Sequence, residues 1–358
     1  MKFRVLLTIV FIAIAPTSFA QSARVKKTPE KETEKPKKEG SYLPTQVVTK
    51  TPVPIPEVSA TPTPTANTDD DVINVESALV PIPVSVVDNA SGRAVTNLTI
   101  DDFRLMIDNK EVEIGEVFRA ESPVRLALLF DNSSSVTIAR EFEQKAAIQF
   151  FKRVIRPDKD LAALYSVAGV SKLEQPLTKD VSALIQAIKL FEKPQGATAL
   201  HDGIIEASNY LQDHAGRRVI VIVSDGQDTL SDATFDQMVK TVQENNCQIY
   251  IVHTNEFENY KRTGSRAGSA NLRALAAERR MKTLAEQTGG AVYSPIDEKE
   301  LDDAFTKISV ELAQQYILGY YPIDEIRDGK MRVIDLNIKT DKSLTIRSRK
   351  GYYVSRPN

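Results

Sequence analysis

One acidic residue and two serines stand together where they could bind a hard divalent cation. Asp131, Ser133 and Ser135 form the pattern D-x-S-x-S, and Asp131 directly follows the apolar run Leu126 to Phe130. Carboxylate and hydroxyl oxygens are the donors that Mg²⁺ takes, and Mg²⁺ keeps water at the positions that a protein leaves open. The pattern therefore indicates a candidate cation site at the end of a buried strand.

Two later turns could complete this site. Thr198 follows the turn Gly196-Ala197, and Asp225 follows a second apolar run, Val219 to Ser224. In open α/β sheets, ligands bind just beyond the carboxyl ends of the strands, where such turns meet. The alternative is a purely structural role, in which the serines cap the next helix and Asp225-Gly226 is only a turn. The candidate metal ligands are Asp131, Ser133, Ser135, Thr198 and Asp225.

These positions resemble a known metal site. D-x-S-x-S, a Thr about 65 residues later and an Asp at the end of a later strand are the pattern of the von Willebrand factor A domain and its metal-ion-dependent adhesion site. The flanking stretches VTNLTIDDFRLMIDNKEVEI, QYILGYYP and LTIRSRKGYYV resemble exported bacterial proteins related to that domain. Val136 departs from the Met that many members carry, but it is not a ligand position.

The resemblance implies a cofactor and a partner. The ion would be Mg²⁺, with Mn²⁺ as the alternative, and some carboxylate charge would act on it through waters. An open coordination position would then accept an anionic oxygen from another protein, an Asp or Glu carboxylate.

The elements that must position these residues alternate between strand and helix. Apolar runs predict strands over 126–130, 161–167, 219–224 and 248–253, with a short edge strand over 173–177. Helical spacing of apolar residues predicts helices over 138–155, 181–191, 198–212, 235–244, 272–287 and 301–312. This alternation predicts a doubly wound, mostly parallel sheet of Rossmann-like, α/β class. The polar stretch 255–270 is interpreted as a mobile loop beside the metal.

Antiparallel β segments flank this unit on both sides. Before it, the sequence predicts a strand over 72–87 and a hairpin of 103–107 with 112–118, turning at Asp108-Asn109. After it come predicted strands over 316–321, 331–339 and 344–354. We expect the segments 71–122 and 315–358 to form one small β-sandwich, into which the α/β domain 123–314 is inserted.

The first 70 residues are interpreted as a signal peptide followed by a linker. Residues 1–20 have a basic start, an apolar run and a small-residue cleavage site, which is typical of a signal peptide. Residues 21–70 are rich in Lys, Glu, Pro and Thr, a composition that predicts a disordered linker. We therefore expect an exported protein, periplasmic or secreted to the cell surface, whose mature chain has no transmembrane segment.

Composition and missing motifs narrow the function. A formal charge of −2 gives no electrostatic case for nucleic acid, and a single cysteine, Cys247, excludes an intrachain disulfide. The sequence lacks G-x-S-x-G and H-E-x-x-H, and its histidines lack the paired spacing of a zinc site. The leading interpretation is a protein-binding module without enzymatic activity. A metal-dependent hydrolase and a purely structural cell-envelope protein are the alternatives.

Overall fold

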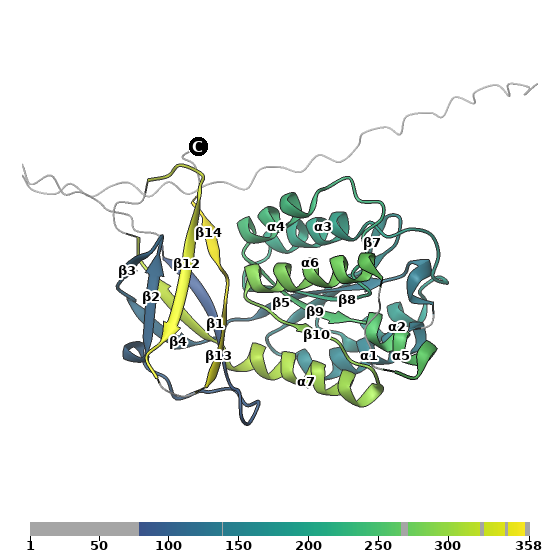
Figure 1. The fold of residues 1–358 in the computed structure, drawn as a ribbon, viewed down its shortest axis with the longest axis horizontal. Coiled ribbons are helices and arrows are strands. Elements are labelled where there is room, and N and C mark those ends of the chain that lie inside the picture. The colour runs from purple at the N-terminus through teal and green to yellow at the C-terminus, as the bar shows by residue number, and fades with distance from the viewer. Residues whose placement is uncertain (1–78, 138, 266–270, 323–325, 341–342, 355–358) are drawn as a thin grey trace, which may run out of the picture. The chain divides into compact units, whose positions relative to one another are not determined.

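The structure is a computed structural model that describes residues 79–137, 139–265, 271–322, 326–340 and 343–354. The chain divides into two units, 1–70 and 71–358, and the described residues all belong to the second. The predicted signal peptide and linker therefore lie outside the described residues. Figure 1 shows a helix-covered sheet and a smaller all-β part.

The central sheet has the predicted doubly wound form. Its strand order is β10-β9-β8-β5-β6-β7, and all neighbouring pairs are parallel except β6 with β7. The predicted edge strand is β7. The bounds are β5 Val124–Asp131, β6 Leu161–Val167, β7 Ser171–Thr178, β8 Arg217–Ser224, β9 Cys247–His253 and β10 Val292–Tyr293.

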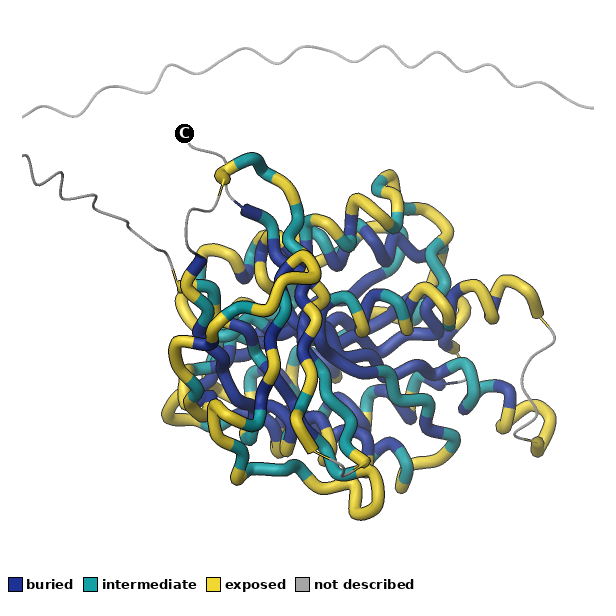
Figure 2. Tube along the Cα trace, turned by 60° about the vertical axis from the view of Figure 1, so that its left-hand side comes forward, coloured by how far each residue is buried: buried dark blue, intermediate teal, exposed yellow. Residues whose placement is uncertain are grey.

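The strand β5 lies in the interior of this sheet and is buried on both faces. Leu126, Leu128 and Phe130 belong to one core cluster, whereas Ala127 and Leu129 belong to the cluster on the other side. Successive residues of a strand point to opposite faces, so a strand covered on both sides needs an unbroken apolar run. Figure 2 shows the buried strands enclosed by helices whose outer surfaces are exposed.

Helices cover both faces of the sheet. Side chains of α1, α2, α5 and α7 pack in the first cluster, and those of α3, α4 and α6 pack in the second (Figure 1). The bounds are α1 Arg140–Val154, α2 Val181–Lys189, α3 Leu200–Gln212, α4 Phe235–Glu244, α5 Asn255–Thr263, α6 Leu272–Thr288 and α7 Glu298–Gln314. None of the helices in the described part of the chain is long and apolar enough to cross a membrane.

The flanking segments form two further four-stranded sheets, which make up the small β-sandwich. Their orders are β13-β1-β11-β4 and β14-β12-β2-β3, so each combines strands from before and after the α/β unit. They share one apolar core, which contains Ile82, Leu105, Leu318 and Ile334. The bounds are β1 Val80–Asp88, β2 Phe103–Ile107, β3 Lys110–Val112, β4 Glu116–Arg119, β11 Tyr316–Tyr320, β12 Met331–Ile338, β13 Leu344–Ser348 and β14 Gly351–Tyr353.

Two predicted strands are wrong in the same way. The stretch 112–118 is not one strand, because β3 pairs with β2 whereas β4 pairs with β11 in the other sheet. The stretch 344–354 likewise divides into β13, which pairs with β1, and β14, which pairs with β12. In both cases the chain crosses between the two layers of the sandwich, and alternation of apolar residues along a segment does not reveal such a crossing.

The prediction of a loop over 255–270 is also wrong for its first part. Residues Asn255–Thr263 form the helix α5, which Gly264 ends in the left-handed conformation. Phe257 explains the helix, since it is buried and stacks on Phe142 of α1. Residues 266–270, and residues 72–78 of the first predicted strand, lie outside the described residues.

Candidate metal centre

Asp131 is the last residue of β5 and is almost completely buried, at 1% exposure. Both of its carboxylate oxygens accept hydrogen bonds. The amide of Ser133 donates to Oδ1 at 3.0 Å, and the hydroxyl of Ser224, the last residue of β8, donates to Oδ2 at 2.6 Å. These bonds hold the carboxylate in one orientation at the carboxyl edge of the sheet.

Between β5 and α1, Ser133 directly precedes a short 3₁₀ turn, Ser134–Val136, and Ser135 lies within it. Their hydroxyl oxygens are 2.9 Å apart, with Ser133 buried and Ser135 exposed. Neither hydroxyl caps a helix: the 3₁₀ turn has no side-chain cap bond, and α1 begins after Ala139. The capping alternative is therefore wrong for both serines, and their hydroxyls stay available as oxygen donors.

Asp225 follows β8 in a tight turn and is also 1% exposed. Its carboxylate accepts hydrogen bonds from the amide and side chain of Gln227, at 3.0 and 2.9 Å. Nε2 of His253 lies 2.8 Å from the Asp225 carbonyl oxygen. A carbonyl oxygen only accepts, so Nε2 carries the proton. His253 is thus a support for this turn rather than a residue lining the outer face.

Hydrogen bonds join the three turns into one edge. The Ser134 amide donates to the Gly196 carbonyl at 3.2 Å, which connects the D-x-S-x-S turn with the turn before Thr198. The Thr198 amide donates to the Thr229 hydroxyl at 3.0 Å, and the Thr229 amide donates to the Thr198 carbonyl at 2.9 Å. The structure thus brings Thr198 to the loop that follows Asp225.

The two aspartates form an electrostatically strained pair. Burial, followed by the charge of Asp225, raises the pKa of Asp131 to about 6. Within the described residues, neither carboxylate forms an ion pair with a lysine or arginine. Buried charge without a partner is costly, and a bound cation would remove that cost. The donor chemistry thus fits a small divalent ion.

Few of the candidate metal ligands are acidic side chains. Across the described residues, no group of three or more His, Cys, Asp or Glu side chains is placed to hold a metal. The candidate donors at this edge are instead two carboxylates and three hydroxyls. Such a set suits Mg²⁺, which completes its six positions with water, better than zinc, which takes nitrogen and sulfur ligands.

Two glutamates beside the site were not singled out from the sequence. Glu143 in α1 is fully buried, and neither of its carboxylate oxygens has a hydrogen-bond partner. Burial, followed by the charge of Asp131, raises its pKa well above the ordinary value. Burial and the charge of Asp225 raise the pKa of Glu258 in α5 to about 8. Glu143 lies four residues before Ala147 on the buried face of α1, and this spacing is the sequence signal that could have indicated its burial.

Two other acidic residues of this region have structural roles. The Asp228 carboxylate accepts from the backbone amides of Leu200 and His201, at 2.8 and 3.2 Å, and so caps the start of α3. The Asp202 carboxylate accepts from the amides of residues 232–233, at 2.9 and 3.0 Å. Together they fasten the loop after Asp225 onto α3.

Comparisons with known proteins agree with this architecture. Residues 126–227 match the family model of the von Willebrand factor type A domain, a span that runs from β5 to the turn after Asp225. A search of curated proteins found no match.

Solved structures of similar fold come from several sources. The aerotolerance-related membrane protein of Bacteroides fragilis is 15% identical, with a TM-score of 0.41, over 53% of this chain and 98% of that chain. The vWF domain of the type V pili tip protein Mfa5 of Porphyromonas gingivalis is 14% identical, with a TM-score of 0.42, over 52% and 94%. These values are too low to carry an argument, so the likeness to the domain rests on the match of residues 126–227. Within the α/β unit, residues 126–227 match the von Willebrand factor type A domain.

Proposed function

We propose that this protein is an exported, metal-ion-dependent protein-binding module. Mg²⁺, with Mn²⁺ as a substitute, would be bound by Asp131, Ser133, Ser135, Thr198 and Asp225. The observation that carries the proposal is the pair of buried aspartates at neighbouring strand ends, which lack a cationic partner within the described residues. The family of the domain adds support, since von Willebrand factor type A domains typically mediate protein–protein interaction.

The chemistry of the donors favours an acidic partner. Three of the five donors are neutral hydroxyls, so the ion would stay electrophilic toward an additional oxygen. Ser135, one of the proposed ligands, is exposed, which supports a site that a partner protein can reach. We therefore propose that an Asp or Glu side chain on an exposed loop of the partner protein occupies the open coordination position.

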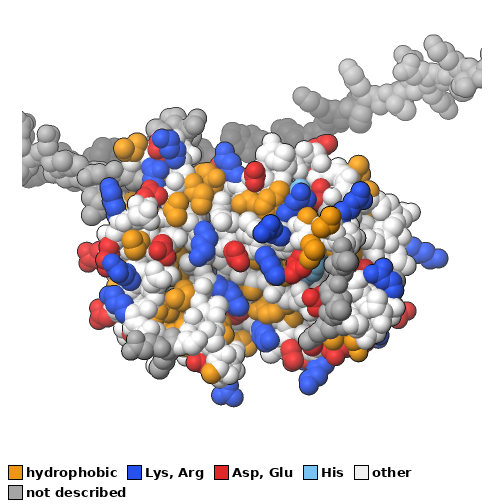
Figure 3. Space-filling model, viewed as in Figure 1, with side chains coloured by type: hydrophobic (Ala, Val, Ile, Leu, Met, Phe, Trp, Pro, Cys, Tyr) orange, Lys and Arg blue, Asp and Glu red, His pale blue; other side chains and the backbone are white. Residues whose placement is uncertain are grey.

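The predicted signal peptide and linker suit a protein that acts outside the cytoplasm. Residues 1–20 would direct the chain out of the cytoplasm, and residues 21–70 would let the binding domain reach partners from a tether. Nucleic acid is not the proposed partner, because the net charge is −2 and the face in Figure 3 shows acidic and basic side chains interspersed.

The test begins by recovering the partner from the exported fraction, by pull-down in Mg²⁺ and in EDTA. Calorimetry then measures partner binding by the wild type and by Asp131→Ala, which we expect to lose both the ion and the partner. Thr198→Ala is expected to reduce the free energy of partner binding more than the free energy of unfolding. Asp236→Ala is the matched control, since Asp236 is an exposed aspartate in the first turn of α4.

One result would overturn the proposal. If a folded Asp131→Ala protein bound the partner in EDTA as tightly as the wild type does in Mg²⁺, the ion would have no role. The contact surface would then lie away from the carboxyl edge of the sheet.

A further inference from the structure

A cavity of about 390 Å³ lies at the opposite end of the parallel strands from the candidate metal centre. It is lined by residues at the starts of β8 and β9 and by residues of β1, β4 and β11. Its polar lining includes three arginines, Arg217, Arg218 and Arg349, and none of its lining residues is an aspartate or glutamate. The site therefore concentrates positive charge without acidic side chains to neutralise it.

Arg349 is the most deeply buried of the three, at 8% exposure. Its guanidinium donates to the Asn246 side chain and, at 2.8 Å, to the Pro81 carbonyl, and its Nε has no partner. Burial lowers the pKa of Arg349 to about 10, so the side chain stays charged at neutral pH. A buried charge that meets only neutral acceptors is costly unless a counter-ion joins it.

Arg217 and Arg218 are only partly buried, but they too donate only to neutral acceptors. Arg217 donates to the Gln315 side chain at 2.8 Å, and Arg218 donates to the Asn245 carbonyl at 2.9 Å. Each also donates to one further backbone carbonyl, and each Nε is buried without a partner. Among the described residues, neither forms an ion pair with a carboxylate.

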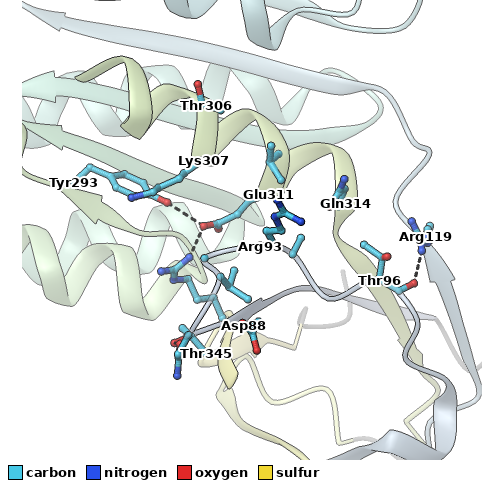
Figure 4. A pocket seen from close by; sticks show the side chains of 16 residues that line it. Asp88, Arg93, Thr96, Arg119, Tyr293, Thr306, Lys307, Glu311, Gln314 and Thr345 are labelled. Atoms are coloured by element: carbon cyan, nitrogen blue, oxygen red, sulfur yellow. Dashed lines mark hydrogen bonds and ion pairs between the residues drawn. The ribbon is translucent and has the colours of Figure 1, made fainter. Parts of the chain in front are cut away.

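A second cavity in the same part of the molecule shows the contrast. In the pocket of Figure 4, of about 600 Å³, Arg347 is paired with Glu311, and the hydroxyl of Tyr293 donates to the same carboxylate at 2.9 Å. That arginine is compensated by the chain itself. Among the described residues, no carboxylate forms an ion pair with the three arginines of the smaller cavity, so an anionic ligand could supply their counter-charge.

The other residues that line the cavity indicate the chemistry of the rest of a ligand. Pro81, Pro83, Phe118 and Ile317 contribute apolar surface to the cavity. The volume falls within the roughly 300–1,000 Å³ usual for sites of small organic ligands. Guanidinium groups bind carboxylates through paired hydrogen bonds, and the apolar walls favour a hydrocarbon body.

We propose that this cavity binds a small amphipathic organic anion, a carboxylate with a medium-length hydrocarbon chain. The carboxylate lies against the three arginines, and the hydrocarbon chain packs on Phe118, Ile317 and the prolines. The site is separate from the candidate metal centre, because β8 begins at Arg217 beside the cavity and ends at Ser224 beside the metal residues.

The experiment uses decanoate as the probe, with the full chain in EDTA so that the metal centre does not contribute. We expect decanoate to raise the melting temperature and to bind in calorimetry, because a ligand that binds only the folded state stabilises it. Decanol, which has the same chain without the charge, is expected to bind at least about tenfold more weakly. Sulfate tests whether a simple anion suffices.

Two variants locate the binding. Arg218→Gln and Arg349→Gln each remove one charge and are expected to weaken decanoate binding at least about tenfold. Arg218 is only partly buried, so its variant keeps the test valid if Arg349→Gln fails to fold. Arg104→Gln is the matched control, because Arg104 is an exposed arginine paired with Glu111 and lies on β2.

Three results would overturn the proposal. The first is no decanoate binding by the wild type, and the second is undiminished binding by a folded Arg218→Gln protein. The third is sulfate binding as tight as that of decanoate, which would show an inorganic-anion site in place of an amphiphile site.

Discussion

The hydroxyl of Ser224, the last residue of β8, donates a hydrogen bond of 2.6 Å to the carboxylate of Asp131, the last residue of β5. The same oxygen accepts from the Gly226 amide at 2.9 Å. Ser224 therefore joins two neighbouring strand ends and the turn that presents Asp225. The bond explains how residues almost a hundred positions apart keep a common orientation at the candidate metal centre.

Replacing Ser224 by alanine is the first prediction. The change leaves a buried carboxylate oxygen without its donor, so we expect a loss of about 1–3 kcal/mol in the free energy of unfolding and weaker Mg²⁺ binding. Urea unfolding and calorimetry measure the two effects. Ser166→Ala is the control, because that hydroxyl bonds to Glu174 on the neighbouring β7. Equal Mg²⁺ affinity in wild type and Ser224→Ala would contradict a positioning role.

The pH dependence of metal binding is the second prediction. The pKa of Asp131, raised to about 6 by burial and by Asp225, means that a proton competes with the ion in acid. We expect Mg²⁺ affinity to be constant above pH 7 and to fall by about tenfold per pH unit well below pH 6. Calorimetry at pH 7.5, 6 and 5 measures this. A flat profile down to pH 5 would exclude Asp131 as a ligand.

The third prediction concerns Glu143, whose pKa is raised well above its ordinary value by burial. A carboxyl with a higher pKa in the folded than in the unfolded state binds its proton more tightly when folded. Stability is therefore unaffected below the unfolded pKa and decreases as pH rises through the interval between the two values.

Glu143→Gln removes this penalty and keeps the shape of the side chain. We expect it to raise the free energy of unfolding by about 1 kcal/mol or more at pH 8 in EDTA, and the gain to shrink toward pH 4. Chemical denaturation at both pH values measures the gain. Glu141→Gln, an exposed position on the same helix, is the control and is expected to be neutral at both. A gain that is the same at pH 4 would show that charge is not its cause.

Cutting the chain after Gln314 is the fourth prediction. The cut removes β11, β12, β13 and β14, which pair with β1, β2 and β4 and complete the core around Ile82 and Leu105. We expect the shortened protein to aggregate, because unpaired strand edges and apolar faces become exposed. Size-exclusion chromatography with light scattering measures its state. A stable monomer with an unchanged melting temperature would show that the sandwich contributes little.

The amino-acid sequence by itself determined the α/β unit and the order of its candidate ligands. Strands buried on both faces need unbroken apolar runs, and Leu126 to Phe130 and Val219 to Val223 have them, so both strands were predicted closely. The side chains of the D-x-S-x-S turn are set by sequence neighbours, as in the bond from the Ser133 amide to Asp131. That these residues bind an ion stays a prediction.

Only the tertiary structure decided which segments face one another. Lys110–Val112 and Glu116–Arg119 carry one continuous β pattern but belong to different sheets, because the crossing depends on partners far away in the chain. The arginine-lined cavity could not be predicted for the same reason. Arg218 and Arg349 lie on separate segments, and within its own segment each resembles an ordinary charged residue. Burial without a counter-charge arises only when distant segments pack together, and local periodicity carries no information about that packing.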